Sequence, residues 1–365
     1  MVLRDHIHRI RTDPLVSHGR HFGRTVRTFC RVHTLITNGL SRTMHLELER
    51  ITKEDLSDVE RADHHQYQQL LGLSPGLEER LNTGNEGDLR YVADMITKGM
   101  GSARSDDTKS LKAAVVDWIT LSNEVLSPPL QRNVKSDRGY LHPRTGELLC
   151  PVNLDWNDEK IRRELKSGHL VPSGDMWPRF LFRNYEYNLA DPWDGLLRSG
   201  LLVKAYKHVF TSPSSVYNGD GTSKSTKSSN ARIHGMTSVT IPSIAYIATQ
   251  ASPVRFALSS GATFSRTDKA TDSEYFYELL IEVLEDPEEY VEVSDLLKWW
   301  NQQIFPSYQI HHRAVHRDSV AAKIKDRRRL IAGGSWKAME PSSSNSSQSD
   351  GRSPSPGALE QEAQS

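Results

Sequence analysis

Hydrophobic residues recur at helical spacing through most of the first 300 positions of the chain. Near its start, one such face is formed by Phe22, Val26, Phe29, His33 and Ile36. Residues three and four apart lie on the same side of a helix. The pattern therefore predicts a helix over about 17–37 that buries this face and ends at Asn38-Gly39, a sequence typical of a helix C-terminus.

The polar side of the same segment is basic. Its arginines, spaced by four, three and four, are Arg20, Arg24, Arg27 and Arg31. On one helix these four would form a single narrow face able to hold phosphates through charge-assisted hydrogen bonds. The second predicted helix, about 52–71, is acidic at its start, with Glu54, Asp55 and Asp58. The arginine face is thus either a ligand-binding surface or a partner of this acidic helix.

Later apolar repeats predict more helices. Leu89, Val92 and Ile96 mark one, and Leu111, Val115 and Trp118 mark another that begins near Ser105 or Asp106. The region 130–156 changes character, because Arg144-Thr145-Gly146 lies between short apolar pieces. This pattern allows a small β-hairpin and a sub-boundary there. We predict a mainly α fold: a multi-helix globular domain over 14–306 with at most one short β-hairpin.

Three segments have little to bury. They are a flexible N-terminus over 1–13, a mobile Ser/Gly-rich loop over 211–235, and a basic, Ser/Pro-rich C-terminal tail over 307–365 that we expect to be disordered. The tail carries a basic cluster, which consists of Lys323, Lys325, Arg327, Arg328 and Arg329. Such clusters are typical of nuclear-localisation signals or nucleic-acid patches.

Composition narrows the class of protein. Lys plus Arg and Asp plus Glu each number 46 among 365 residues, so the net charge is zero, which argues against a dedicated nucleic-acid binder. The two cysteines, Cys30 and Cys150, are far apart and fit a reducing compartment. The charged N-terminus resembles no secretory signal, and no apolar run is long enough to span a membrane. We expect an intracellular protein of the nucleus or cytoplasm, not secreted and with no membrane partner.

Candidate chemistry is sparse. The motifs of nucleophile elbows, P-loops, dinucleotide folds and zinc peptidases do not occur, so we predict no catalytic residue, cofactor or metal site. Two polar blocks make up a candidate anion site: Arg104, Asp106, Asp107, Lys109, Arg232 and His234. The two aspartates would stand at a helix start, where capping is the simpler interpretation. An enzyme with a phosphate or metal site would require the two blocks to converge.

Several blocks, taken in order, carry a family resemblance. They read HGRHFGRTVRTFCRVHTLITNGL, ARSDDTKSLK, GYLHPRTGELLCP, HVFTSPSSV, NARIHGMTSVT and WWNQQIFP. Together they resemble a family of uncharacterised proteins, a domain of unknown function, that is expanded in mushroom-forming fungi. The resemblance spans most of 14–306 and implies no activity and no site residue.

Three hypotheses of function remain. The leading one is a non-enzymatic binding or scaffold protein, associated with nucleic acid through its basic helix face and basic tail. The second is a protein–protein interaction module whose arginine face is paired internally. The third is an enzyme that uses the polar blocks as a phosphate or metal site.

Overall fold

A computed structural model of the chain describes residues 13–120, 125–216, 229–249, 253–260 and 273–305, together with positions 320, 323, 324 and 327. The chain divides into two compact units, Met1–Gln309 and Ile310–Ser365. The predicted flexible N-terminus before Asp13, the centre of the 211–235 loop and almost all of the predicted tail lie outside the described residues.

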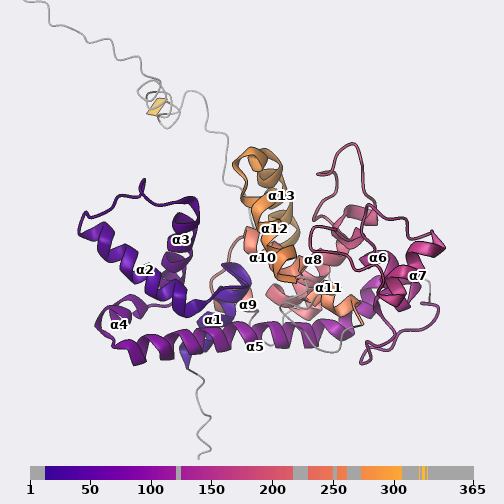
Figure 1. Cartoon of the computed structure of the whole chain (residues 1–365), viewed down its shortest axis with the longest axis horizontal. Coiled ribbons are helices and arrows are strands. Elements are labelled where there is room, and N and C mark those ends of the chain that lie inside the picture. Colours follow the sequence, from indigo (N-terminus) through magenta and orange to yellow (C-terminus); the bar gives the residue numbers. More distant parts are fainter. Residues whose placement is uncertain are drawn as a thin grey trace, which may run out of the picture. The chain divides into compact units, whose positions relative to one another are not determined.

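The first unit is mainly helical, as the hydrophobic spacing predicts (Figure 1). The helices of its first half are α1 (Pro14–Thr25), α2 (Val32–Glu47), α3 (Asp58–Leu73), α4 (Leu77–Thr83), α5 (Glu86–Ile119), α6 (Pro143–Leu149) and α7 (Glu159–Ser167). Those of its second half are α8 (Gly200–Tyr206), α9 (Asn230–Ile233), α10 (Ile241–Ala248), α11 (Pro253–Leu258), α12 (Ser273–Glu285) and α13 (Tyr290–Ile304).

Local sequence sets several helix starts. The Asp13 carboxylate accepts a hydrogen bond from the Leu15 backbone N–H at 2.8 Å at the start of α1. Reciprocal capping boxes begin α3, through Ser57 and Glu60, and α5, through Asn85 and Asp88. These side chains satisfy backbone N–H groups that the first helical turn leaves without a partner.

The 34-residue helix α5 organises the first unit. Helix α1 packs directly on α5, and Figure 1 shows the two side by side. A Cβ at Gly19 would lie 2.3 Å from the Ile96 carbonyl oxygen, and one at Gly99 would lie 2.3 Å from the Val16 carbonyl oxygen. Glycine is therefore required on both helices for so close an approach.

Two large hydrophobic clusters share α5. The first joins α1–α4 to the N-terminal half of α5 and buries Phe22, Tyr67 and Ile96. The second joins the C-terminal half of α5 to α8, α10, α12 and α13, and buries Leu111 and Trp300. One continuous helix thus connects both parts of the core.

The helix predicted over 17–37 is wrong, because the segment forms two helices. Helix α1 ends at Thr25 and α2 begins at Val32. Between them, the Thr28 backbone N–H donates to the Tyr277 hydroxyl at 3.3 Å, and the Thr28 carbonyl accepts from Arg104 at 3.1 Å. These tertiary hydrogen bonds satisfy backbone groups that a continuous helix would satisfy internally.

The predicted burial of this segment holds for four of its five positions. Phe22, Val26, Phe29 and Ile36 are buried, whereas His33 is exposed on α2. The predicted C-terminus at Asn38-Gly39 is also wrong, because α2 continues to Glu47. A Cβ at Gly39 would lie 2.2 Å from the ring of Tyr67. The glycine therefore allows α3 to approach α2 and does not end the helix.

The hairpin allowed within 130–156 is not formed. Arg144, Thr145 and Gly146 lie inside α6, which starts with Pro143 and is capped by the His142 Nδ1 atom, an acceptor for the Arg144 backbone N–H at 3.0 Å. In the described part of the chain, β structure is limited to an isolated bridge between Pro151 and Pro178. The proline start and histidine cap favour a helix over a turn. The sub-boundary near 130–156 stays a prediction.

Candidate functional site

The main candidate site is a cavity of about 690 Å³ beside the middle of α5. Its basic lining residues are Arg104, Lys109, Lys112 and Lys135. We call it the basic pocket, since none of the described residues lining it is acidic. Besides Gly101 and Val134, the wall includes hydroxyl and amide groups, from Ser105, Thr108, Asn133, Ser136 and Ser260. Every one of these groups can donate a hydrogen bond.

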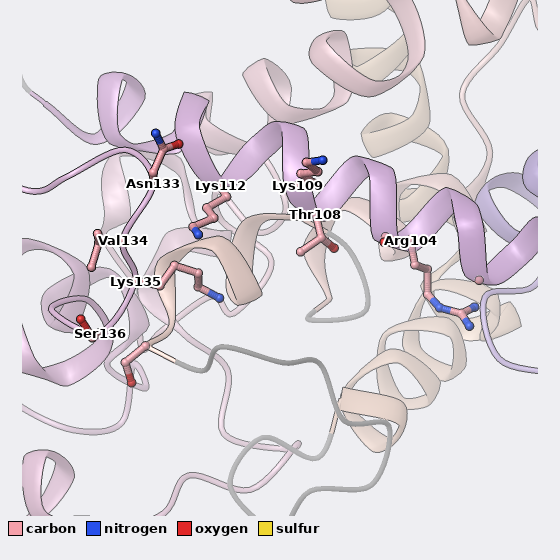
Figure 2. A pocket seen from close by; sticks show the side chains of 11 residues that line it. Arg104, Thr108, Lys109, Lys112, Asn133, Val134, Lys135 and Ser136 are labelled. Carbon is pink, nitrogen blue, oxygen red and sulfur yellow. The ribbon is translucent and has the colours of Figure 1, made fainter.

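One face of α5 supplies half of the pocket. Arg104, Thr108 and Lys112 follow each other at intervals of four, which places them in a row along the helix. The segment 133–136 faces this row. Figure 2 shows the amino groups of Lys112 and Lys135 pointing into the space between the helix and this segment. The pocket is therefore assembled from parts of the chain more than 20 residues apart.

Lys135 is the most buried of the four cations, with 6% of its surface exposed. Burial, together with the charges of Arg138 and Lys112, lowers its pKa to about 7. A lysine in this environment is partly protonated at neutral pH. An anion bound beside Lys135 would favour its charged form.

Arg138 fixes the segment that carries Lys135. Its fully buried guanidinium donates to the carbonyl oxygens of Lys112 and Ala257, each at 2.8 Å. It also donates to the carbonyls of Gln131 at 2.9 Å and Arg132 at 3.1 Å. One side chain thereby ties 131–138 to α5 and α11. These charge-assisted hydrogen bonds hold the segment that carries Lys135 against both helices.

The predicted arginine face does not form, because the helix break at 26–31 separates its members. Arg20 contacts Asp106 at 2.7 Å, and Arg27 contacts Glu278 at 2.5 Å. Arg31, just before α2, is exposed. The partners of these arginines come from α5 and α12, whereas the sequence suggested Glu54, Asp55 and Asp58.

Arg24 is the buried member of this set. Its guanidinium binds the Asp107 carboxylate through two hydrogen bonds, of 2.8 and 2.7 Å. The Tyr246 hydroxyl donates to the same carboxylate at 2.6 Å. Both charged side chains are less than a tenth exposed, and Asp107 holds the pKa of Arg24 above its usual value. This network connects α1, α5 and α10.

The helix start expected at Ser105 or Asp106 is wrong. Helix α5 begins at Glu86 behind the Asn85 cap, so Asp106 and Asp107 lie in its interior and cap nothing. Their side chains are engaged by Arg20 and Arg24, outside the basic pocket. Of the predicted anion site, Arg104 and Lys109 line the pocket.

The second polar block lies near α1. The ring of His234 stacks on His21 with a centroid distance of 4.2 Å. Burial lowers the pKa of His21 to about 3 and that of His234 to about 4, so both rings are neutral at neutral pH. Arg232, in α9, is exposed. The charge of Arg24, the partner of Asp107, acts on both His21 and His234.

The basic cluster of the tail is described in part. Lys323 and Arg327 are helical and exposed, and belong to the second compact unit. Lys325, Arg328 and Arg329 lie outside the described residues. Its role in nuclear localisation or nucleic-acid binding stays a prediction.

Sequence reasoning missed two of the four cations that line the basic pocket, Lys112 and Lys135. Lys112 is not among the predicted site residues, because its neighbours Leu111 and Val115 indicate a buried helix face. Its spacing of four and eight residues from Thr108 and Arg104 is nevertheless visible in the sequence. Lys135 and Asn133 come from a segment with no periodic pattern. Their position depends on Arg138 and its backbone partners, which no local pattern reveals.

The described residues include no group of three or more His, Cys, Asp or Glu side chains that could hold a metal ion. None of the helices in the described part is long and apolar enough to cross a membrane.

No curated protein and no solved structure matches the chain. A family of unknown function, DUF6698, matches residues 98–305. Since this match covers more than half of the sequence, the chain belongs to that family.

Proposed function

We propose that the protein is a non-enzymatic binding protein that recognises a phosphate-bearing ligand in the basic pocket. The observation that carries the proposal is the convergence of Lys112 and the buried Lys135 on one cavity. The charge of Lys112 contributes to the lowered pKa of Lys135, and an anion bound between the two side chains would oppose that effect. Arg104 and Lys109 also line the pocket, and the Arg104 guanidinium donates to the Thr28 carbonyl at 3.1 Å.

The pocket size favours a ligand no larger than a nucleotide. Cavities that bind small molecules have volumes of about 300–1,000 Å³, and this one has about 690 Å³. The hydroxyl and amide donors around the lysines suit phosphate oxygens, which only accept hydrogen bonds from the protein. We therefore expect a small phosphorylated molecule as the ligand.

Association with nucleic acid is the weaker form of this proposal. Three of the four arginines that suggested it contact carboxylates of the protein itself. Contact with a phosphate backbone would have to replace these ion pairs. An intracellular location in the nucleus or cytoplasm, and the occurrence of relatives in mushroom-forming fungi, remain predictions from the sequence.

Isothermal titration calorimetry with pyrophosphate and with a mononucleotide tests the proposal. We expect saturable binding that weakens as the pH rises above 7, because Lys135 then loses its proton. K112Q should weaken binding by about tenfold, the scale of one charge-assisted hydrogen bond. K98Q is the matched control, since Lys98 is an exposed lysine of α5 outside the pocket.

Two outcomes would contradict the proposal. The first is no heat of binding with either compound at millimolar concentration. The second is equal affinity in wild type and K112Q. A mobility-shift titration with single-stranded RNA over a salt series addresses the weaker form, since binding through phosphates must fall steeply with salt.

A further inference from the structure

A second cavity, of about 460 Å³, has the opposite character to the basic pocket. Its walls include the aromatic side chains of Trp177, Phe182, Tyr187 and Trp193. Asp175 is the charged residue among the described residues that line it, and no lysine or arginine is among them. We call it the aromatic pocket. It shares no lining residue with the basic pocket.

Side-chain contacts orient three of these four aromatic residues. Phe182 and Tyr187 pack edge to face, with a centroid distance of 5.2 Å and an interplanar angle of 73°. The Trp193 indole N–H donates to the Glu289 carboxylate at 2.7 Å, which fixes that ring. The Trp177 carbonyl accepts from the Val152 backbone N–H at 2.9 Å, beside the bridge between Pro151 and Pro178. The contacts orient Phe182, Tyr187 and Trp193, and Trp177 is the fourth aromatic residue that lines the cavity.

Charge complements this arrangement. Asp175 is exposed at the pocket, and the Ser173 hydroxyl donates to its carboxylate. Glu289 holds the Trp193 ring on the side of its N–H edge. The nearby Arg179 donates to the Leu154 carbonyl at 3.2 Å and is not part of the lining. The pocket thus joins electron-rich aromatic rings to a negative side chain.

Aromatic faces attract cations, and they suit a methylated ammonium best. A quaternary ammonium has no N–H to donate, so it needs no hydrogen-bond acceptor and loses little hydration on entering a ring of aromatic side chains. We propose that the aromatic pocket binds a quaternary ammonium group, with Asp175 balancing its charge. This inference is independent of the phosphate-binding proposal, because it rests on other residues.

Quenching of tryptophan fluorescence in the full chain tests the inference with a matched pair of probes. Choline and 3,3-dimethylbutan-1-ol have the same shape, but only choline is charged. We expect saturable quenching by choline and by tetramethylammonium, and none by the neutral alcohol at the same concentration. Absence of binding by both cations, or equal binding of choline and the alcohol, would overturn the inference.

Variants locate the binding. W177L should weaken the affinity for choline by about tenfold, since one aromatic wall is lost. D175N should weaken it by about threefold, because an exposed charge contributes less. The control is E186Q, an exposed carboxylate of the same segment outside the lining. Choline binding unchanged in both W177L and D175N, measured by calorimetry, would also overturn the inference.

A further titration distinguishes a small molecule from a modified protein segment as the carrier of the ammonium group. Free Nε-trimethyllysine and a short peptide containing trimethyllysine are titrated beside choline. Equal affinity for all three shows that the pocket recognises the ammonium group of a small molecule. At least tenfold tighter binding of the peptide shows recognition of a modified protein segment. Either result supports the quaternary ammonium site itself.

Discussion

Arg24 and Lys135 are both buried cations beside α5, and their surroundings differ completely. Arg24 lies against the core, where Asp107 binds it through two hydrogen bonds and Tyr246 completes the network. Lys135 lies on the pocket side, where burial and the charges of Arg138 and Lys112 lower its pKa. A buried charge is costly unless it is compensated. The first cation is compensated within the fold, whereas we propose that a bound anion stabilises the charged form of the second.

Of the substitutions that test this comparison, we expect the largest loss of stability at Asp107. Replacing it in D107A leaves the Arg24 guanidinium buried without its carboxylate, and should lower the free energy of unfolding by about 3–5 kcal/mol. D106A is the matched control, because the Arg20–Asp106 pair is largely exposed and contributes at most about 1 kcal/mol. Chemical denaturation of both variants measures the difference. Equal, small losses would show that Arg24 does not depend on Asp107.

Two glycines of α5, Gly99 and Gly101, test how tightly each side of the helix is packed. Gly99 faces α1, where a Cβ would meet the Val16 carbonyl oxygen, so G99A should destabilise the protein by about 1–3 kcal/mol. Gly101 lies on the pocket side with ample space, so G101A should stabilise α5 by up to about 1 kcal/mol. Thermal unfolding of the two variants should give midpoint shifts of opposite sign. Shifts of the same sign would contradict the assigned packing.

The smallest effect is expected at Lys135, and it depends on pH. Its folded pKa of about 7 is below the usual 10.5, so between these values the unfolded chain binds more protons than the folded one. The free-energy cost of burying the charged lysine is fully present below pH 7. It decreases as the pH rises from 7 towards 10.5. K135M should therefore stabilise the protein at pH 6 by about 1 kcal/mol, with a smaller gain at pH 9. Urea denaturation of both proteins at the two pH values measures these gains. A loss of stability in K135M at pH 6 would contradict this account.

The sequence predicts part of this architecture for clear physical reasons. Helical spacing identifies the mainly α class and the burial of Phe22, Val26 and Phe29, because burial of a periodic face is a local property of the chain. The break at 26–31 was not predicted, since it is held by Tyr277 and Arg104 from distant segments. Distant partners also explain why the helix start predicted near Asp106 is wrong. Asp106 and Asp107 are typical of a helix start, but they lie inside α5 and bind Arg20 and Arg24 of α1.

The candidate site shows the same division. Arg104 and Lys109 could be selected from a polar block, but their meeting with Lys135 requires the fold. The buried guanidinium of Arg138 bonds carbonyl oxygens of four different residues, and backbone acceptors leave no trace in side-chain patterns. The position of Lys135 is therefore a tertiary property, which spacing along the chain cannot predict.

Proton uptake on ligand binding tests the central assignment of Lys135 most directly. Calorimetric titrations with pyrophosphate at pH 7.5, in buffers of different ionisation enthalpy, give the number of protons taken up on binding. An anion beside Lys135 raises its pKa from about 7, so wild type should take up more protons than K135M and bind more tightly. Equal proton uptake and equal affinity in the two proteins would contradict the account.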